Sequence, residues 1–181
     1  MAVNMRKVRL KAVWLLILPF LWLARPTPLL LGVGVVLAVV GLAVRGWAAG
    51  TIHKEKELTT TGPYAFTRNP LYVGSFFLGL GITLAGGHWA WPALFVAFYA
   101  GVYGKTMAGE RELLTGLFGD RYRAYAANVP AVAPRLTPWR EPGVEGGGFT
   151  WAQYKRNREW EAALGALVGF AFLGGKWWLG L

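Results

Sequence analysis

The 181-residue chain carries a net charge of +10 and is 55% hydrophobic but only 15% charged, whereas soluble domains are typically about a quarter charged. This composition excludes intrinsic disorder, which requires low hydrophobicity. The sequence has no Cys, which excludes disulfides, thiolate zinc sites and cysteine nucleophiles. With ten Trp residues and a mean hydropathy of +0.37, the composition predicts an integral membrane protein.

Five apolar segments are candidates for membrane-spanning helices. A span needs roughly 20 apolar residues, and about 17 to 25 are tolerated. The segments are Val8–Ala24, Leu29–Ala49, Leu71–Gly86, Trp89–Met107 and Ala162–Leu181. Pro and Gly at 25–28 and 86–88 predict tight turns within two of the resulting hairpins. We therefore expect an all-α fold, a bundle of about five transmembrane helices.

The basic residues follow the loops on one side of this predicted bundle. Seventeen Lys and Arg residues fall within 1–11, 45–70 and 105–161, and only Arg25 and Lys176 lie on the other side. Because positively charged loops stay in the cytoplasm, the N-terminus and both long polar segments are predicted to be cytoplasmic. A nucleic-acid-binding patch is the competing interpretation, but such a patch would gather on one face. We expect the lipid bilayer as a partner and no nucleic acid.

The polar segment before the third apolar stretch is dense in side chains that bind ligands. Within nine residues it holds Tyr64, Phe66, Arg68 and Tyr72. An Arg suits bidentate binding of a carboxylate, and aromatic faces suit a purine or a cation. The alternative is a solvated loop that leads into a helix beginning at Pro70, with Asn69 as its N-cap.

The segment after the fourth apolar stretch predicts an amphipathic helix. Its apolar face is formed by Leu114, Phe118, Tyr122 and Tyr125. A helix lying on the headgroups would account for most of this stretch. Glu110 and Glu112 differ from the rest, because a carboxylate close to hydrocarbon is costly unless it is paired or binds a ligand.

Both polar segments contain short motifs in a fixed order. The motifs are Gly62-Pro63-Tyr64, Arg68-Asn69-Pro70-x-Tyr72-x-Gly74, Glu110, Leu114, Phe118-Gly119-x-x-Tyr122-x-x-Tyr125, Val129-Pro130 and Pro134. Over about residues 50–138 this pattern resembles the isoprenylcysteine carboxyl methyltransferase and phospholipid methyltransferase family. The resemblance implies a membrane enzyme that uses S-adenosylmethionine, with cytosolic helix ends and a following amphipathic helix that close a cofactor pocket.

The resemblance also implies roles for individual residues. The cofactor-binding residues would be Tyr64, Arg68, Asn69, Pro70, Tyr72, Glu110, Glu112, Tyr122 and Tyr125. Arg68 and Glu110 are the predicted catalytic residues. From the chemistry of these side chains, we expect Glu110 or Glu112 to bind the methionyl ammonium and Arg68 to pair with a carboxylate of the cofactor or the acceptor. We expect Tyr64 to pack near the adenine. No metal ligand is expected.

Two positions depart from the family pattern. Asn69 stands where many members have His, which removes a titratable group and argues against a general base at this position. Glu110 is followed by Arg111, whereas many members have paired Glu residues. The sequence therefore leaves open whether Glu110 or Glu112 is the working acid.

Two small residues in the third apolar segment have two interpretations. Gly79-Leu80-Gly81 is similar to a Gly-x-Gly cofactor motif of the phospholipid branch. Small residues also allow close packing of helices in membranes, and this is the interpretation we favour.

The tail beyond the motifs begins with a predicted flexible linker, residues 138–150, which is rich in Pro and Gly. An aromatic belt at the membrane surface would explain Trp151, Tyr154 and Trp160. The alternative is a segment that folds back over the cofactor pocket, formed by Asn157, Arg158 and Glu159, with the last apolar stretch as an extra wall. We expect residues 1–181 to form a single domain, with an additional helix and span in 151–181.

Together, these patterns predict S-adenosylmethionine-dependent methyl transfer to a lipidic or small apolar acceptor. The reacting group would be a carboxylate, a thiol or an amine. A membrane reductase related to the sterol reductases and a scaffold without activity are the alternatives, because one fold hosts several functions and the acidic pair is altered.

Overall fold

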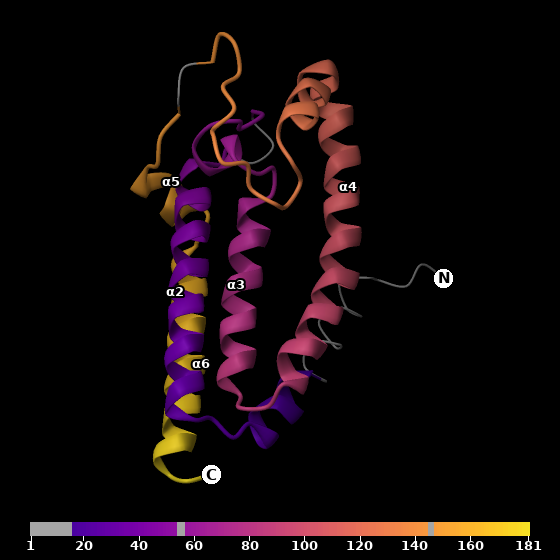
Figure 1. Cartoon of the computed structure of the whole chain (residues 1–181). Helices are drawn as coiled ribbons and strands as arrows, with labels where there is room; N and C mark the ends of the chain where they lie inside the picture. The colour runs from indigo at the N-terminus through magenta and orange to yellow at the C-terminus, as the bar shows by residue number, and fades with distance from the viewer. Residues whose placement is uncertain (1–15, 54–56, 145–146) are drawn as a thin grey trace, which may run out of the picture.

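The computed structural model describes residues 16–53, 57–144 and 147–181, and helices make up its framework (Figure 1). The elements are α2 (Pro28–Thr51), the 3-10 helix η1 (Gly62–Ala65), α3 (Pro70–Ala85), α4 (Ala90–Asn128), α5 (Trp151–Arg156) and α6 (Trp160–Trp178). Residues 16–23 are helical as well, and the described residues contain no strand. The all-α prediction is confirmed for this part of the chain.

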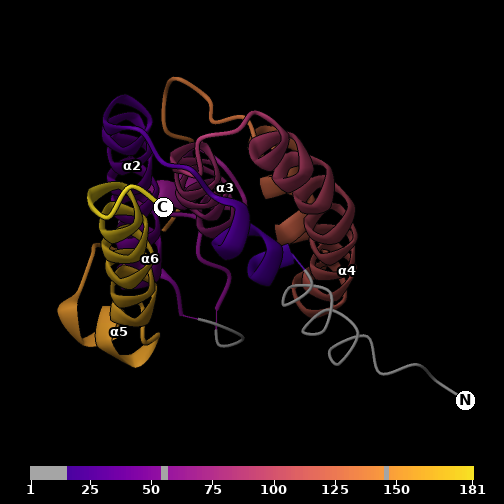
Figure 2. The same cartoon turned by 90° about the horizontal axis from the view of Figure 1, so that it is seen from below.

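The long helices form a bundle in which α3 occupies the middle. α2 and α6 lie side by side and both pack against α3, while α4 lies on the other side of α3 (Figure 1). Figure 2 shows the same order from below. The linker after α4 and the segment between α2 and α3 meet at one end of the bundle, and this end carries the candidate site.

Glycines let α2 and α3 pack with their backbones in contact. A Cβ added at Gly34 would lie 2.5 Å from the carbonyl oxygen of Gly81, and one added at Gly41 would lie 2.6 Å from that of Gly74. A Cβ added at Gly79 would likewise lie 2.4 Å from the phenyl ring of Phe95 in α4. The packing interpretation of the Gly-x-Gly motif is therefore confirmed.

The fourth apolar segment and the polar segment after it form one helix. α4 runs for 39 residues and has no end near Met107, where the sequence predicts a change from a span to an amphipathic helix. A kink comes later, at Gly119, whose φ of 52° is in the left-handed region that Gly adopts without steric cost. The helical turns after this kink bury Tyr122 and Tyr125.

The two predicted turns lie together at the opposite end of the bundle. The Arg25 N–H donates to the Gly86 carbonyl oxygen at 2.9 Å. Gly87 has a φ of 83°, and a Cβ there would lie only 1.8 Å from the Arg25 carbonyl oxygen. Side chains from residues 16–24, α3 and α6 form a small core above these turns, made of Phe20, Ala24, Ala85 and Leu173.

Of the described helices, α2 alone is long and apolar enough to cross a membrane, and α3 is apolar but shorter. The arrangement of about five spans is therefore not confirmed. α3 has only 16 residues, fewer than the roughly 20 of a typical span. The first predicted span, Val8–Ala24, lies within the described residues only from residue 16 onward, where residues 16–23 are helical. α2 nevertheless exposes large apolar side chains, including Leu29, Val36 and Val39, which suit an apolar solvent better than water.

Candidate functional site

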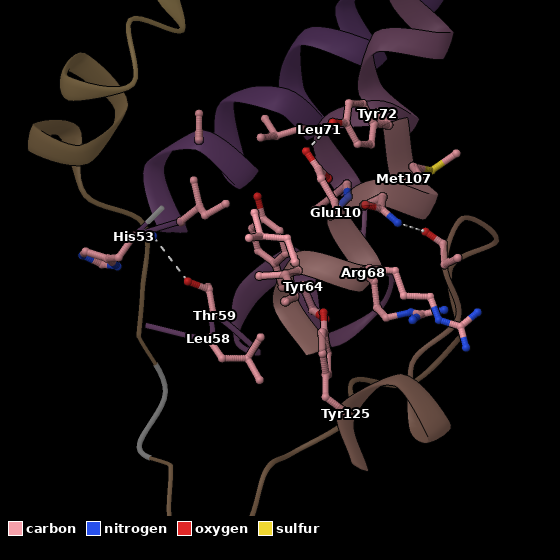
Figure 3. A pocket seen from close by; sticks show the side chains of 18 of the residues that line it. His53, Leu58, Thr59, Tyr64, Arg68, Leu71, Tyr72, Met107, Glu110 and Tyr125 are labelled. Carbon is pink, nitrogen blue, oxygen red and sulfur yellow. Dashed lines mark hydrogen bonds between the residues drawn. The ribbon is translucent and has the colours of Figure 1, made fainter. Parts of the chain in front are cut away.

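A cavity of about 610 Å³ opens at the end of the bundle where α2 ends and α3 begins (Figure 3). Small-ligand sites in proteins typically have volumes of about 300 to 1,000 Å³. The cavity walls come from α2, the segment before α3, α3 itself, α4 and the end of α5. Eight of the nine predicted cofactor-binding residues line it, namely Tyr64, Arg68, Asn69, Pro70, Tyr72, Glu110, Tyr122 and Tyr125.

The segment before α3 is held in place by the linker after α4. Gly62 starts η1 with a φ of 58°, which turns the chain back toward the bundle. The Arg68 N–H donates to the Pro130 carbonyl oxygen at 2.9 Å, and the Trp139 N–H donates to that of Ala65, also at 2.9 Å. These backbone bonds fix the motif residues against α4 although the two segments are far apart in sequence.

Asn69 takes the predicted N-cap position of α3 but does not cap the helix with its side chain. Its Nδ2 group instead donates to the Ala131 carbonyl oxygen at 2.9 Å. Pro70 follows at the first helical position, where the missing N–H costs nothing. The capping prediction is therefore wrong for the side chain, because the linker after α4 offers Asn69 a closer partner.

Tyr64 presents a buried hydroxyl without a partner. The residue is 6% exposed, and its hydroxyl oxygen has no hydrogen-bond partner among the residues that the structure describes. Burial raises the pKa of the Tyr64 phenol, and the nearby Tyr125 and Glu110 raise it further. The Tyr125 hydroxyl donates to the Tyr64 carbonyl oxygen at 2.7 Å and so holds this residue in position. Tyr64 is therefore a neutral buried donor at the cavity wall whose hydrogen bond no described group satisfies.

Arg68 has a similar unused donor. Its Nη1 group donates to the Tyr122 hydroxyl at 3.3 Å, whereas its buried Nε has no partner within the described part of the chain. A buried donor without a partner costs free energy, about 1 to 3 kcal/mol. Tyr64 and Arg68 therefore give the same cavity two donors that a bound ligand would satisfy.

The structure distinguishes the two acids between which the sequence does not choose. Glu110 lines the cavity, and its Oε1 accepts a hydrogen bond of 2.6 Å from the Tyr72 hydroxyl. Glu112 is exposed on the same helix and does not line the cavity. Figure 3 shows Glu110 and Tyr72 together on one side of the cavity.

Arg45 is a cavity residue that the sequence analysis missed. Its Nε and Nη2 donate to the two carboxylate oxygens of Glu159 at 2.6 and 3.0 Å, and its Nη1 donates to Ser75. A signal was present in the sequence, because a charged residue inside an apolar helix usually has a partner or a function.

The tail contributes to the cavity only in part as the alternative interpretation describes, because no residue of α6 (Trp160–Trp178) is among the described residues that line it. Asn157 and Glu159 line the cavity wall. Arg158, between them, is exposed and pairs with Glu161 instead. The aromatic-belt interpretation requires exposed aromatic side chains. Two of the three residues that it names, Trp151 and Trp160, are exposed.

A metal centre does not emerge from the described residues. Within residues 16–53, 57–144 and 147–181, no group of three or more His, Cys, Asp or Glu side chains could hold a metal ion.

The described part of the chain is a helical bundle with a cavity of small-ligand size at one end. A family model described as phospholipid methyltransferase matches residues 19–121, which include α2, α3 and most of α4. The chain belongs to this family of methyltransferases. The family predicted from the sequence motifs is thereby confirmed.

Three curated relatives are similar to parts of the chain. The nickel-cobalt-cadmium resistance protein NccN of Alcaligenes xylosoxydans xylosoxydans is 39% identical over 59% of this chain and 49% of its own length. The protein-S-isoprenylcysteine O-methyltransferase of Schizosaccharomyces pombe is 33% identical over 46% of this chain and 36% of its own. The cobalt-zinc-cadmium resistance protein CzcN of Cupriavidus metallidurans is 34% identical over 72% and 60%.

The chain thus spans between 36% and 60% of the length of these relatives. No solved structure matches it.

Proposed function

We propose that this protein transfers a methyl group from S-adenosylmethionine to a lipidic or small apolar acceptor at the cytosolic face of a membrane. Membership of the phospholipid methyltransferase family supports methyl transfer over the reductase and scaffold alternatives. The observation that carries the proposal is the cavity itself. It is lined by the carboxylate of Glu110 and by two residues with buried donors that lack partners among the described residues, Tyr64 and Arg68.

These side chains fit the charged groups of S-adenosylmethionine. In our proposal, Glu110 binds the methionyl ammonium, with its carboxylate oriented by the Tyr72 hydroxyl. The unused Nε of Arg68 donates to the methionyl carboxylate, a charge-assisted bond that is stronger than a neutral one. The Tyr64 hydroxyl supplies a neutral donor near the adenine, since a phenol is already protonated at neutral pH and burial raises the pKa of this one further.

The cofactor, when bound, supplies a methyl group on a positively charged sulfur. The protein mainly has to align donor and acceptor and to exclude water, which accelerates a two-reactant step by proximity and orientation. A general base is not needed for a carboxylate or thiolate acceptor. Asn69 is consistent with a reaction that needs no general base. Its side chain does not titrate, and its amide group donates to the Ala131 carbonyl oxygen.

The proposed membrane arrangement is multi-pass, with the N-terminus and the cavity on the cytoplasmic side and the lipid bilayer as a partner. The distribution of basic residues supports it, because Lys and Arg are concentrated in the segments at the cavity end. The chain lacks Cys, so single Cys probes can be introduced cleanly. In intact cells, Ala133→Cys near the cavity should resist a membrane-impermeant maleimide, whereas His88→Cys at the opposite turn should react.

Calorimetric titration of S-adenosylhomocysteine into the full chain in nanodiscs tests the cofactor assignment. Saturable binding is expected. A folded protein that does not bind S-adenosylhomocysteine would contradict the proposal, and oxidation of NADPH by the same sample would favour the reductase alternative. Tritium transfer from methyl-labelled S-adenosylmethionine to dodecanoate, dodecanethiol or dodecylamine then identifies the acceptor group, because these probes differ only in their head groups.

A further inference from the structure

Three polar side chains from three different helical regions meet at one wall of the cavity. Arg45 of α2 forms a bidentate ion pair with Glu159, which precedes α6, and also donates to the Ser75 hydroxyl of α3. The Glu159 side chain is only 7% exposed and that of Arg45 is 22% exposed. All three residues line the cavity. The family match ends at residue 121, so Glu159 comes from a part of the chain that this match does not cover.

This cluster lies deeper in the bundle than the residues proposed to bind the cofactor. Arg45 precedes the end of α2 at Thr51 by six residues, which corresponds to about 9 Å along the helix axis. Ser75 lies five residues after the start of α3, or about 7.5 Å along its axis. Arg68, in contrast, lies in the segment before α3. The cluster therefore occupies the end of the cavity that faces the apolar part of the bundle.

Arg45 retains donors that the ion pair does not use. A guanidinium group has five N–H donors, and the contacts to Glu159 and Ser75 use three of them. An Arg that is held on two sides by a carboxylate and a hydroxyl keeps a fixed orientation. Its remaining donors suit a ligand group that carries lone pairs, and they do not suit an ammonium group, which has none.

We propose that Arg45 binds the polar head of the methyl acceptor, that Glu159 and Ser75 are the positioning residues that orient Arg45, and that the acceptor head is a carboxylate. The Ser75 hydroxyl accepts from Arg45 and donates to the Leu71 carbonyl oxygen at 2.8 Å, so it holds the guanidinium group and does not contact the acceptor. This inference rests on the proposed methyltransferase function and adds the acceptor end of the same cavity. The acceptor's hydrocarbon part then extends toward the apolar bundle, and its carboxylate oxygen lies between the cluster and the methyl donor. The carboxylate oxygen forms a new bond to the methyl carbon. The bond between that carbon and sulfur breaks, and the electron pair of the broken bond stays on sulfur.

The test uses dodecanoate and dodecylamine, which have the same chain length and opposite head groups. Each is titrated into the full chain in nanodiscs, with empty nanodiscs as the blank, both with and without S-adenosylhomocysteine. With S-adenosylhomocysteine present, dodecanoate should bind the wild-type chain about tenfold more tightly than dodecylamine, because the spare Arg45 donors form a charge-assisted bond with the carboxylate while Glu110 is occupied by the methionyl ammonium. Tighter binding of dodecylamine, or no binding of dodecanoate, would overturn the assignment.

Variants separate positioning from simple stabilisation. Glu159→Gln should weaken dodecanoate binding about tenfold while the affinity for S-adenosylhomocysteine stays within about twofold. Glu159→Asp, which keeps the charge, should restore dodecanoate binding to within about threefold of wild type. Glu161→Gln is the matched control, since Glu161 pairs with Arg158 outside the cavity and its loss should change neither affinity.

A second substitution keeps the inference testable if Glu159→Gln does not fold. Ser75→Ala removes one hydroxyl from the cluster and should weaken dodecanoate binding about threefold. Dodecanoate affinities equal to wild type in folded Glu159→Gln or Ser75→Ala would overturn the acceptor site. A wild-type chain that binds dodecanoate but no S-adenosylhomocysteine would refute the proposed function alone, so the two failures are distinguishable.

Discussion

Two walls of the cavity differ in whether their buried polar groups have hydrogen-bond partners. The motif wall, residues 58–72 and 110–125, contains Tyr64 and Arg68, the two residues among those described with a buried side-chain donor that lacks a partner. The C-terminal wall, residues 149–159, pairs its polar groups with the end of α2. Because an unpaired buried donor costs free energy, it is expected where a ligand completes the hydrogen bond. The motif wall is therefore arranged for binding, and the C-terminal wall for holding the site together.

The end of α2 explains why the C-terminal wall is so well paired. The last carbonyl groups of a helix have no partner within the helix. Here the Asn157 Nδ2 group donates to the Ala49 carbonyl oxygen at 2.7 Å, the Thr150 N–H donates to that of Gly50 at 2.9 Å, and Gln153 donates to that of Ile52. The tail thus satisfies the carbonyl groups that α2 leaves at the cavity rim.

The largest expected effect is on the motif wall. Glu110→Gln should weaken binding of S-adenosylhomocysteine about 30-fold or more, because it removes the charge that faces the methionyl ammonium. Calorimetric titration measures this change. Glu112→Gln is the control, since Glu112 is exposed outside the cavity, and it should bind like wild type. The opposite ranking of the two variants would move the acid to Glu112 and remove Glu110 from the binding site.

A substitution on the C-terminal wall should affect stability rather than cofactor binding. Gln153→Ala removes the buried amide group that donates to the Ile52 carbonyl oxygen. The loss of this hydrogen bond should lower the free energy of unfolding by about 1 to 2 kcal/mol. Thermal unfolding in detergent measures this loss, and calorimetry should show unchanged affinity for S-adenosylhomocysteine. A selective loss of cofactor affinity with normal stability would contradict the distinction between the two walls.

The unpaired hydroxyl of Tyr64 predicts the reverse outcome. Tyr64→Phe removes an oxygen that makes no hydrogen bond in the structure, so the melting temperature should stay the same or rise slightly. Binding of S-adenosylhomocysteine should weaken about fivefold, because the ligand loses one donor. Tyr125→Phe is the comparison, since its hydroxyl donates to the Tyr64 carbonyl oxygen and its removal should lower stability. A Tyr64→Phe variant that melts well below wild type would mean that the hydroxyl has a partner within the protein.

The smallest effect concerns the linker that supports the motif wall. Arg121 donates to both carboxylate oxygens of Glu141, and this pairing, together with the Thr60 hydroxyl, lowers the pKa of Glu141 below its ordinary value. A lowered folded-state pKa means stabilisation that is present above the unfolded pKa and is lost as the pH falls through the folded value. The melting temperature should therefore decrease on acidification below about pH 5.

Glu141→Gln removes this titration, so its melting temperature should depend less on pH than that of wild type. Asp120→Asn is the control, because Asp120 is an exposed carboxylate on the same helix as Arg121 and should leave the pH dependence almost unchanged. Equal pH dependence in wild type and Glu141→Gln would show that the Arg121 pair does not stabilise the linker.

Much of the motif wall was predictable from the sequence because its residues are close together in the chain. Tyr64, Arg68 and Tyr72 lie within a short segment, and Glu110 follows a long apolar stretch. The family resemblance added the order of these motifs. The side-chain partner of Asn69 was not predictable, because Ala131 lies in a linker whose path depends on the kink at Gly119.

The sequence by itself determined the helical class, the turns at 25–28 and 86–88, the family and the residues of the motif wall. These features depend on the spacing of apolar residues, on Pro and Gly positions and on short motifs, all of which involve residues close together in the chain. The tertiary structure alone decided the pairing of Arg45 with Glu159, which are separated by 114 residues. It also decided the choice of Glu110 over Glu112 as a cavity residue. Both outcomes depend on how α4 and α6 pack beside α2 and α3, and a contact between distant segments leaves no periodic signal in a single sequence.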